Sequence, residues 1–582
     1  MTVLPKDRLP LTTSPGERAA RRRATAVVVV MIALLALLLL MPLIRAVSRG
    51  FTHDGKASVY WFGRILTNQI LLSEMLNSVL LACTTTAIAL LLAVPLAMIR
   101  SSVRFRGQGV LSVLILLPLI LPPFVGAMSM SRLLAHYGVL NQILARVGIL
   151  SNAAAGPDWL GGGFAGVAAL QALHLFPILY LNASAALANI DPAYAQAARN
   201  LGAGRWRTFR SVTLPLMRPG LFAGGTIVFI WALTDIGTPL ILGYERLTAV
   251  TLFKELARAE INPRTYSLVF VMLTGAVTLY VLGKFVFGRS VRLDSSKATV
   301  AVEAPRLGVV GTAWAWLAFG GVIGLAILPH IGVVLTAISA RWVNTILPSQ
   351  ITFDHLRFVL VRPETRVCIM NSLRYAGAST AVDVVIGSII AWLLVRTRAR
   401  GRTLLDSTAM LPLAVPGLIL AAGYVAITAR GSWLESIGPM NNPFVILVIA
   451  YSVRRLPFIV RGVSAGLEQI PIALEEASRN LGASRPATVL RITLPLIAAS
   501  VLAATVLTFS FAMLEVSDSL ILAQTESHYP ITKEIYRQAT SGNRDAASVA
   551  AALGVYGMVL LGGSMALAGA LLGRRLGAIF RA

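Results

Sequence analysis

The chain has 582 residues, of which 56% are hydrophobic and 13% are charged. Soluble proteins carry about 25% charged residues, so this composition excludes an ordinary soluble domain. A net charge of +26 would suggest nucleic-acid binding in a soluble chain. In this chain the distribution of the Lys and Arg residues along the sequence decides between nucleic acid and membrane lipid as the partner.

Apolar runs that are long enough to span a bilayer recur along the whole chain. A run of roughly 20 apolar residues crosses the hydrocarbon core as a helix. We predict about twelve such helices, and hence an all-α polytopic membrane protein. They lie near residues 25–46, 77–99, 109–134, 163–187, 216–242 and 266–288, and near residues 308–338, 370–395, 404–429, 441–466, 495–522 and 548–573.

The first apolar run resembles a secretory signal because it follows Arg21, Arg22 and Arg23. Its apolar core is about twice the length of a signal-peptide core, and no small-residue cleavage site follows it. We therefore expect this run to be retained as the first membrane helix.

Two short basic loops fix the expected orientation. The segments Arg100–Arg106 and Arg396–Arg402 contain no acidic residue and connect neighbouring apolar runs. Loops rich in Lys and Arg stay in the cytoplasm. Both termini are then cytoplasmic, and the positive charge indicates contact with membrane lipid and no nucleic-acid partner.

The sequence contains no motif for catalysis, metal binding or ATP binding. Cys83 and Cys368 lie far apart, outside any metal-binding or redox pattern, and none of the six histidines belongs to a catalytic motif. No GxxxxGK[ST] segment for ATP binding occurs. We expect no catalytic residue, no metal site and no cofactor in this chain.

The second half of the chain repeats the first. Asn77 matches Asn371, and Gln196 matches Glu476, with an insertion in the first copy around Gly156–Gly163. Each copy has six predicted helices, an even number, so the copies are parallel repeats. Two such halves stand face to face with a solute path between them.

The repeat gives the following expected organisation. A cytoplasmic tail, 1–24, precedes the first half, 25–288, and a cytoplasmic linker, 289–307, joins it to the second half, 308–573, before a cytoplasmic tail, 574–582. The repeated cores are 77–288 and 371–573.

One loop of each half, 189–215 and 469–495, carries nearly the same twenty residues: QAARNLGAGRWRTFRSVTLP and EASRNLGASRPATVLRITLP. In the first loop Asp191 is the expected N-cap of a short helix, whereas in the second loop Ile470 takes that place. Gly202 and Gly482 fit left-handed C-caps. We expect a cytoplasmic docking helix in each loop; the alternative is a loop helix that lies on lipid headgroups.

These two loops resemble the signature loop of binding-protein-dependent ABC importer permeases, which reads Glu-Ala-Ala, three residues, Gly, nine residues, Ile-x-Leu-Pro. Ser478 and Val212 depart from that pattern, and Gln196 stands in place of its glutamate. The matching residues are Gln196, Ala197, Ala198, Gly202, Leu214 and Pro215 in the first copy, and Glu476, Ala477, Gly482, Ile492, Leu494 and Pro495 in the second.

The resemblance implies a permease subunit of the bacterial plasma membrane, whose coupling helices dock on an ABC ATPase homodimer. That ATPase would bind ATP and Mg, and a periplasmic or lipid-anchored solute-binding protein would deliver the solute. Gln196 implies that the two halves couple unequally.

Two further segments, FIWALTDIGTPLILG from Phe229 and ITFDHLRFVL from Ile351, look like the fused two-copy permeases of the ferric-iron type. Ferric iron is the solute that this resemblance implies. Relatives of that type also carry phosphonates, polyamines or thiamine.

Five ionisable residues fall inside predicted spans, where such residues mark function by default. His174 and Arg454 occupy matched positions of the repeat, Asp235 and Glu515 form a second matched pair, and Asp383 is unmatched. We expect them along the substrate path. Each could instead bond a neighbouring helix or reach the membrane interface.

Prolines interrupt the third predicted helix of each half. Pro118, Pro122 and Pro123 in the first copy correspond to Pro412 and Pro416 in the second. Such prolines produce kinks that serve as hinges or reflect irregular packing.

Two other classes compete with an importer. An ion-coupled secondary carrier also has two six-helix halves, but paired docking loops argue against it. A membrane-embedded enzyme would need a catalytic constellation, which the histidines do not provide.

Overall fold

The computed structural model describes residues 15–160, 163–258, 261–287, 305–543 and 545–572. The predicted linker 289–307 and the tails 1–24 and 574–582 lie largely or wholly outside these ranges.

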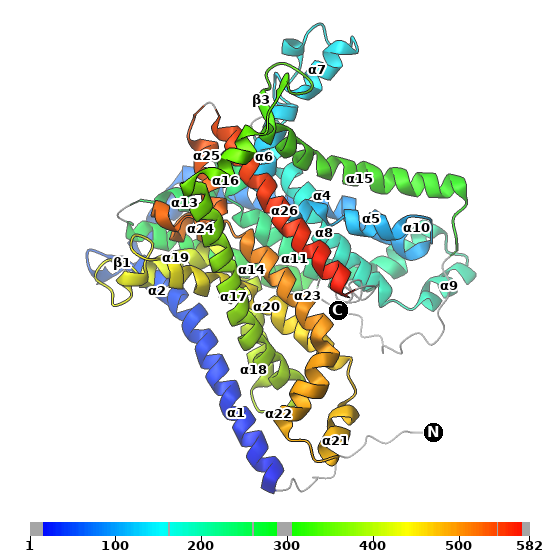
Figure 1. Ribbon diagram of the computed structural model, residues 1–582, viewed down its shortest axis with the longest axis vertical. Coiled ribbons are helices and arrows are strands. Elements are labelled where there is room, and N and C mark those ends of the chain that lie inside the picture. The colour runs from blue at the N-terminus through cyan, green and yellow to red at the C-terminus, as the bar shows by residue number, and fades with distance from the viewer. Residues whose placement is uncertain (1–14, 161–162, 259–260, 288–304, 544, 573–582) are drawn as a thin grey trace.

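The described chain is almost entirely helical (Figure 1), which confirms the predicted fold class. Its strands form two short antiparallel hairpins: β1 (Thr52–His53) with β2 (Lys56–Ala57), and β3 (Ser339–Arg341) with β4 (Gln350–Ile351).

The helices of the two halves follow the same order. The first half contains α1 (Pro15–Leu35), α2 (Met41–Gly50), α3 (Tyr60–Thr67), α4 (Gln69–Ser102), α5 (Gln108–Leu114), α6 (Pro123–Leu134), α7 (Val139–Arg146), α8 (Phe164–Ala188), α9 (Pro192–Asn200), α10 (Arg205–Thr208), α11 (Leu214–Thr234), α12 (Gly237–Ile241), α13 (Thr248–Leu256) and α14 (Pro263–Phe287). The second half contains α15 (Val309–Ala337), α16 (Asp354–Val361), α17 (Pro363–Arg396), α18 (Arg402–Met410), α19 (Gly417–Ile427), α20 (Phe444–Glu468), α21 (Ile472–Asn480), α22 (Arg485–Thr488), α23 (Leu494–Met513), α24 (Ser517–Leu522), α25 (Ile531–Thr540) and α26 (Ala546–Leu572).

Within the described ranges, nine helices are long and apolar enough to cross a membrane, or eleven if each of two bent pairs counts as one span. The remaining predicted span corresponds to α20. It is long enough, but Arg454, Arg455 and Arg461 set it apart from the purely apolar helices.

The third predicted helix of each half is broken at its prolines. The two pieces meet at 94° in the first half and at 99° in the second. Pro122 and Pro416 occupy the break with nearly identical backbone angles, ψ 133° and 135°. A residue before proline is pushed out of the helical region, so Leu121 is extended and ends the first piece.

The two halves repeat one packing pattern. In the first half α4 and α11 pack on α8, and in the second α17 and α23 pack on α20. Small residues allow the close approach. A Cβ atom added to Gly220 would lie 2.7 Å from the Ala186 side chain, and one added to Gly462 would lie 2.5 Å from that of Ala504.

The leading helices are exchanged between the halves. α1 and α2 pack on α18 and α19 of the second half, whereas α15 packs on α6 of the first half as well as on α26. Hydrogen bonds fix both exchanges: Tyr424 Oη donates to Leu38 O over 3.0 Å, and Ser129 Oγ donates to Pro329 O over 2.7 Å. The halves are therefore interlocked.

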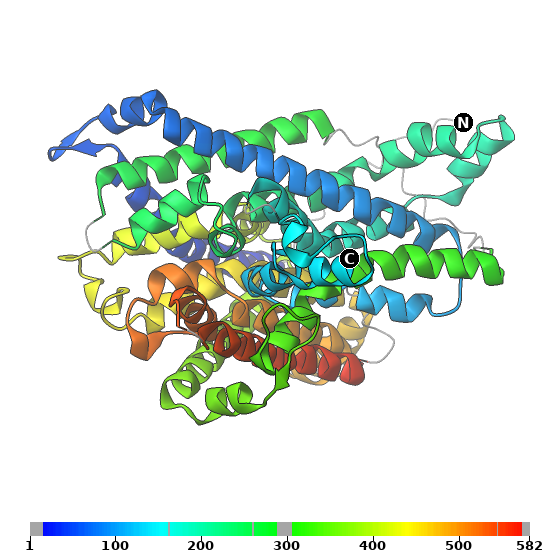
Figure 2. The ribbon, with the colours of Figure 1, turned by 90° about the horizontal axis from the view of Figure 1, so that it is seen from above.

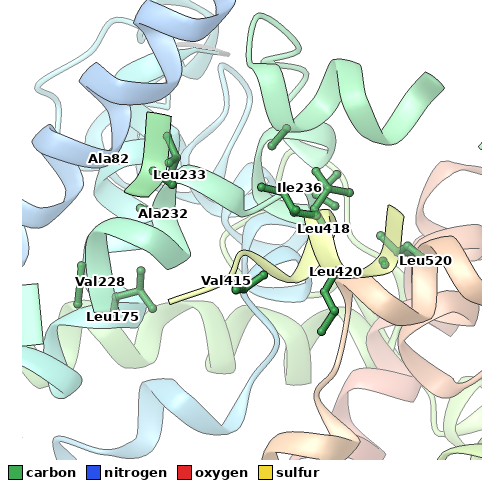
Figure 3. Packing of buried hydrophobic residues seen from close by; sticks show 14 of the residues in the cluster. Ala82, Leu175, Val228, Ala232, Leu233, Ile236, Val415, Leu418, Leu420 and Leu520 are labelled. Atoms are coloured by element: carbon green, nitrogen blue, oxygen red, sulfur yellow. The ribbon is translucent and has the colours of Figure 1, made fainter. Parts of the chain in front are cut away.

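One apolar core joins the halves. Val415, Leu418 and Leu520 from the second half belong to the same buried cluster as Leu175 and Ile236 from the first (Figure 3). Seen from above, the helices from α4 to α14 gather on one side and α23 to α26 on the other (Figure 2). Any space between the halves is therefore lined by both repeats.

Candidate functional site

The two predicted coupling loops fold as short helices at the far ends of the two halves. α9 and α10 lie at one edge of the molecule and α21 and α22 at another, well separated in Figure 1 and away from α7 and β3. Neither α9 nor α21 buries a residue, and Leu201 and Leu481, just beyond them, are each 89% exposed. The loops thus present uncovered apolar surface.

The motif residues take matched places in both loops. Gly202 and Gly482 follow the helices with φ of +82° and +88°, values that favour glycine. Gln196, Ala197 and Ala198 lie in α9, Glu476 and Ala477 in α21, Ile492 in a π-helical turn, and Leu214, Pro215, Leu494 and Pro495 in the first turns of α11 and α23.

The helix starts differ from each other, and one differs from the prediction. Asp191 is the N-cap of α9, where its Oδ1 accepts a hydrogen bond from the Ala193 N–H over 2.9 Å. The order Ile470-Pro471 predicts an N-cap at Ile470, but α21 starts one residue later, with Pro471 at the N-cap and no side-chain cap. Proline has no polar side-chain atom to accept the first N–H groups.

A cavity of about 130 Å³ lies between the halves. Four of the five predicted path residues line it, together with side chains from both repeats. Its lining comprises Leu119, Leu121, Pro122, Pro123, Gln171, His174, Leu175, Trp231, Thr234, Asp235, Arg454, Arg455, Phe511, Leu514, Glu515, Val516 and Ser517.

The second half contributes a buried ionic cluster to this cavity. Arg454 and Arg455 each pair with one oxygen of Glu515, and Arg454 Nη1 lies 3.3 Å from Asp518 Oδ2. Glu515 and Asp518 are 2% and 0% exposed. Charges removed from water in this way are stable only as a paired set.

The first half contributes different polar side chains to the cavity at the positions that match Glu515 and Arg454. Asp235 accepts hydrogen bonds from Gln171 Nε2 over 3.1 Å and from the Gly237 N–H over 3.0 Å. His174 stands where the second half has Arg454. Among the described residues, Asp235 forms no ion pair, so the two sides of the cavity differ in charge.

Asp383 does not line the cavity. It is fully buried between α17 and α20, where its Oδ1 accepts a hydrogen bond from Ser452 Oγ over 2.5 Å. The structure therefore separates it from the other four predicted path residues.

Sequence reasoning missed an aromatic pair. Trp231 and Phe511 occupy matched positions of the repeat, and their rings meet edge to face with centroids 6.2 Å apart. Phe458 stacks on Phe511 at 5.0 Å, and the Arg455 guanidinium lies over the Phe511 ring. The matched segments WALTD and FAMLE could have revealed the pair.

The aromatic pair also lines a second, larger cavity of about 380 Å³. This cavity lies toward the coupling loops, because Ala185 and Ala465 in the last turns of α8 and α20 contribute to its wall. The rest of its lining is mostly apolar. Trp231 and Phe511, together with Leu119 and Leu514, line both cavities and thus separate the polar one from the apolar one.

Sequence reasoning also missed three polar residues of the cavity region. These are Gln171, Arg455 and Asp518. All three contact a residue that was predicted. Among the described residues, no group of three or more His, Cys, Asp or Glu side chains is arranged to hold a metal ion.

Comparison with known families identifies the architecture. The family described as binding-protein-dependent transport system inner membrane component matches residues 85–295 and 383–580, once in each half. The chain belongs to this family. It is an ABC importer permease with two fused permease domains, and a multi-pass protein of the inner membrane.

Two curated relatives and one solved structure are similar to this chain. The putative ferric transport system permease protein FbpB 1 of Haemophilus influenzae is 26% identical over 478 residues, 80% of this chain and 72% of the relative. The probable molybdenum ABC transporter permease of Haloferax volcanii is 35% identical over 179 residues, 31% of this permease and 62% of the relative. A crystal structure of a bacterial ABC transporter that imports alginate aligns with a TM-score of 0.36 and 22% identity over 46% of this chain and 98% of that chain.

Proposed function

We propose that this permease imports ferric iron. The observation that supports the proposal is its similarity over 80% of its length to a permease described as ferric, which has the same fused form. A separate solute-binding protein delivers the iron from outside, and a homodimer of ABC ATPases with bound ATP and Mg drives transport from the cytoplasm.

The coupling loops carry the movement of the ATPases. In this proposal α9 and α21 lie on the cytoplasmic side, as do the N- and C-termini of the chain. Each of the two helices docks on one ATPase subunit. Their exposed Leu201 and Leu481 offer the apolar surface that such contacts bury. Two helices at matched positions suit a partner that is itself a dimer.

The solute path runs through the two cavities. His174, Asp235, Arg454 and Glu515 line the polar cavity, and the apolar cavity leads from it toward the coupling loops. Trp231 and Phe511 form the partition between them. The separated coupling loops and the larger cavity on their side fit an inward-facing state with that partition closed.

Closure of the ATPases would draw the coupling loops together. The exchanged leading helices also join the halves away from the coupling loops, where α2 packs on α19 and α15 packs on α6, so the halves would turn about those contacts. This movement narrows the apolar cavity and opens the polar one to the outside. Pro122 lines the polar cavity, and Pro416 precedes Gly417, which lies against the cavity residue Arg454. The helix breaks at these prolines give each half a place to bend.

Uptake of radiolabelled ferric iron by iron-limited cells tests the solute. Cells that lack this chain should lose uptake, and wild-type protein should restore it, whereas uptake of an aminophosphonate, a polyamine and thiamine should not change. Unchanged iron uptake in cells without another iron importer would reject the assignment, and loss of one of the other solutes would replace it.

A further inference from the structure

One arginine joins three helix ends in the second half. Arg396 is the last residue of α17 and is 5% exposed. Its Nε donates to Glu475 Oε1 in α21 over 2.9 Å. Its Nη2 donates to the carbonyl oxygens of Leu467 and Ile470, at and just beyond the end of α20, over 2.8 and 3.1 Å.

These contacts are well suited to hold a helix in place. The last carbonyl groups of α20 have no partner within the helix, and a cation there is favoured by the helix dipole. The planar guanidinium binds the carboxylate and the carbonyls at once. Glu475 is only 12% exposed, so loss of either partner leaves a poorly solvated charge.

The first half lacks this tether. Ser102, the last residue of α4, is the residue that matches Arg396 in the repeat, and within the described ranges no side-chain hydrogen bond joins it to α8 or α9. The nearby Arg100 instead donates its Nε to Ser112 Oγ in α5 over 3.2 Å. Ala195 stands where the second half has Glu475, and α9 is capped by its own Asp191. Among the described residues, no ion pair joins α9 to α4 or α8.

A second contact stiffens the same loop. Ser478 Oγ lies 3.1 Å from Thr488 Oγ1, so a hydrogen bond links α21 to α22. The first copy has Ala198 at the matching position and cannot form it. The tethered helix α20 also carries Arg454 and Arg455, so a direct mechanical link runs from α21 to the polar cavity.

We propose that Arg396 is a positioning residue that holds α21, the coupling helix of the second half, rigidly against the ends of α17 and α20. The coupling helix of the first half, α9, lacks this contact and moves more freely. This inference rests on the proposed function, in which α9 and α21 dock on the ATPases. It also locates the unequal coupling of the halves in a contact inside the permease rather than in Gln196.

Hydrogen–deuterium exchange of the full chain in lipid nanodiscs tests the tether without any partner. Wild-type α21 should exchange about tenfold more slowly than α9. Arg396→Gln and Glu475→Gln should each raise the exchange of α21 to that of α9, whereas the control Arg100→Gln, which removes an arginine near the end of α4, should leave α9 unchanged. Equal exchange of α21 in the wild type and both variants would overturn the proposal.

ATP hydrolysis by the complex with its ATPase tests the consequence. Arg396→Gln should co-purify with the ATPase at wild-type level and keep basal hydrolysis, but lose several-fold stimulation by ferric-loaded binding protein. Arg396→Lys should recover part of it. Full stimulation in Arg396→Gln, or loss of co-purification in both Arg396→Gln and Glu475→Gln, would overturn the positioning role.

The two failures are distinguishable. A wild-type complex that the binding protein does not stimulate would count against the proposed function, whereas the exchange of α21 would still decide the tether.

Discussion

Glu515 and Asp235 follow α23 and α11 at matched positions, yet they depend on different partners. Glu515 neutralises Arg454 and Arg455, whereas Asp235 is held by an amide and a backbone N–H. The repeat in the sequence paired these acids correctly and brought them to one cavity. The repeat did not reveal that Glu515 belongs to an ionic cluster. Membership of that cluster depends on which side chains of α20 face the end of α23, and the sequence does not give this orientation.

The difference predicts two distinct phenotypes. Glu515→Gln leaves two buried arginines short of a partner and should cost about 3–5 kcal/mol of stability. Asp235→Asn keeps an acceptor for Gln171 and should unfold near the wild-type temperature, but with reduced solute uptake. Thermal unfolding in detergent and uptake in liposomes separate the two; equal destabilisation by both variants would show that Asp235 is structural.

Asp383 shows the limit of single-residue reasoning. An acid inside a span indicates either a path or a helix contact, and sequence spacing alone does not choose between them. Its hydrogen bond to Ser452 within the α17 and α20 interface favours the contact.

At the scale of elements, close packing of α8 on α11 and of α20 on α23 supports each half. These contacts depend on small residues such as Gly220 and Gly462, which lie against alanines of the neighbouring helix. The sequence revealed the repeated helices, but the helical periodicity did not show which of their glycines lie at a helix–helix contact.

The short helices of the loops 189–215 and 469–495 were predictable because the cap Asp191 and the glycines Gly202 and Gly482 are local signals. The start of α21 lies one residue later than predicted because neither Ile470 nor Pro471 has a side chain that can cap a helix.

A glycine substitution tests the packing at this scale. Gly462→Ala would place a methyl group 2.5 Å from Ala504 and should destabilise the protein by about 1–3 kcal/mol. Gly557→Ala in α26 meets nothing within 4 Å and is the matched control, expected to be neutral or slightly stabilising. Equal unfolding temperatures for the two variants would contradict the close contact.

At the scale of the whole molecule, the exchanged leading helices interlock the halves and the aromatic pair divides the space between them. Neither feature could be predicted, since an apolar run does not specify which half it packs against. The parallel repeat did predict a space lined by both halves, and the two cavities lie between the halves. Passage of a solute through them stays a prediction.

The aromatic partition predicts a leak. Replacing both Trp231 and Phe511 with alanine should join the two cavities and let solute pass without ATP, because the rings are the two aromatic groups among the four residues that line both cavities. Solute efflux from loaded liposomes measures the leak. Leu507→Ala shortens a side chain that lines the apolar cavity and not the polar one, and serves as the control; equal, low efflux from both variants would place the partition elsewhere.

In the proposed mechanism, ATPase movement reaches the solute path through the two coupling loops. ATP-dependent uptake of ferric iron, delivered by its binding protein, in liposomes that contain the permease and its ATPase tests this coupling most directly. Gly202→Asp and Gly482→Asp place a charge on each docking surface, where a new side chain meets nothing within 4 Å of its Cβ. Gly431→Asp, at another open glycine of positive φ, is the control. We predict that uptake is lost in the first two variants and kept in the third; uptake that persists in all three, or that proceeds without the ATPase, would contradict the account.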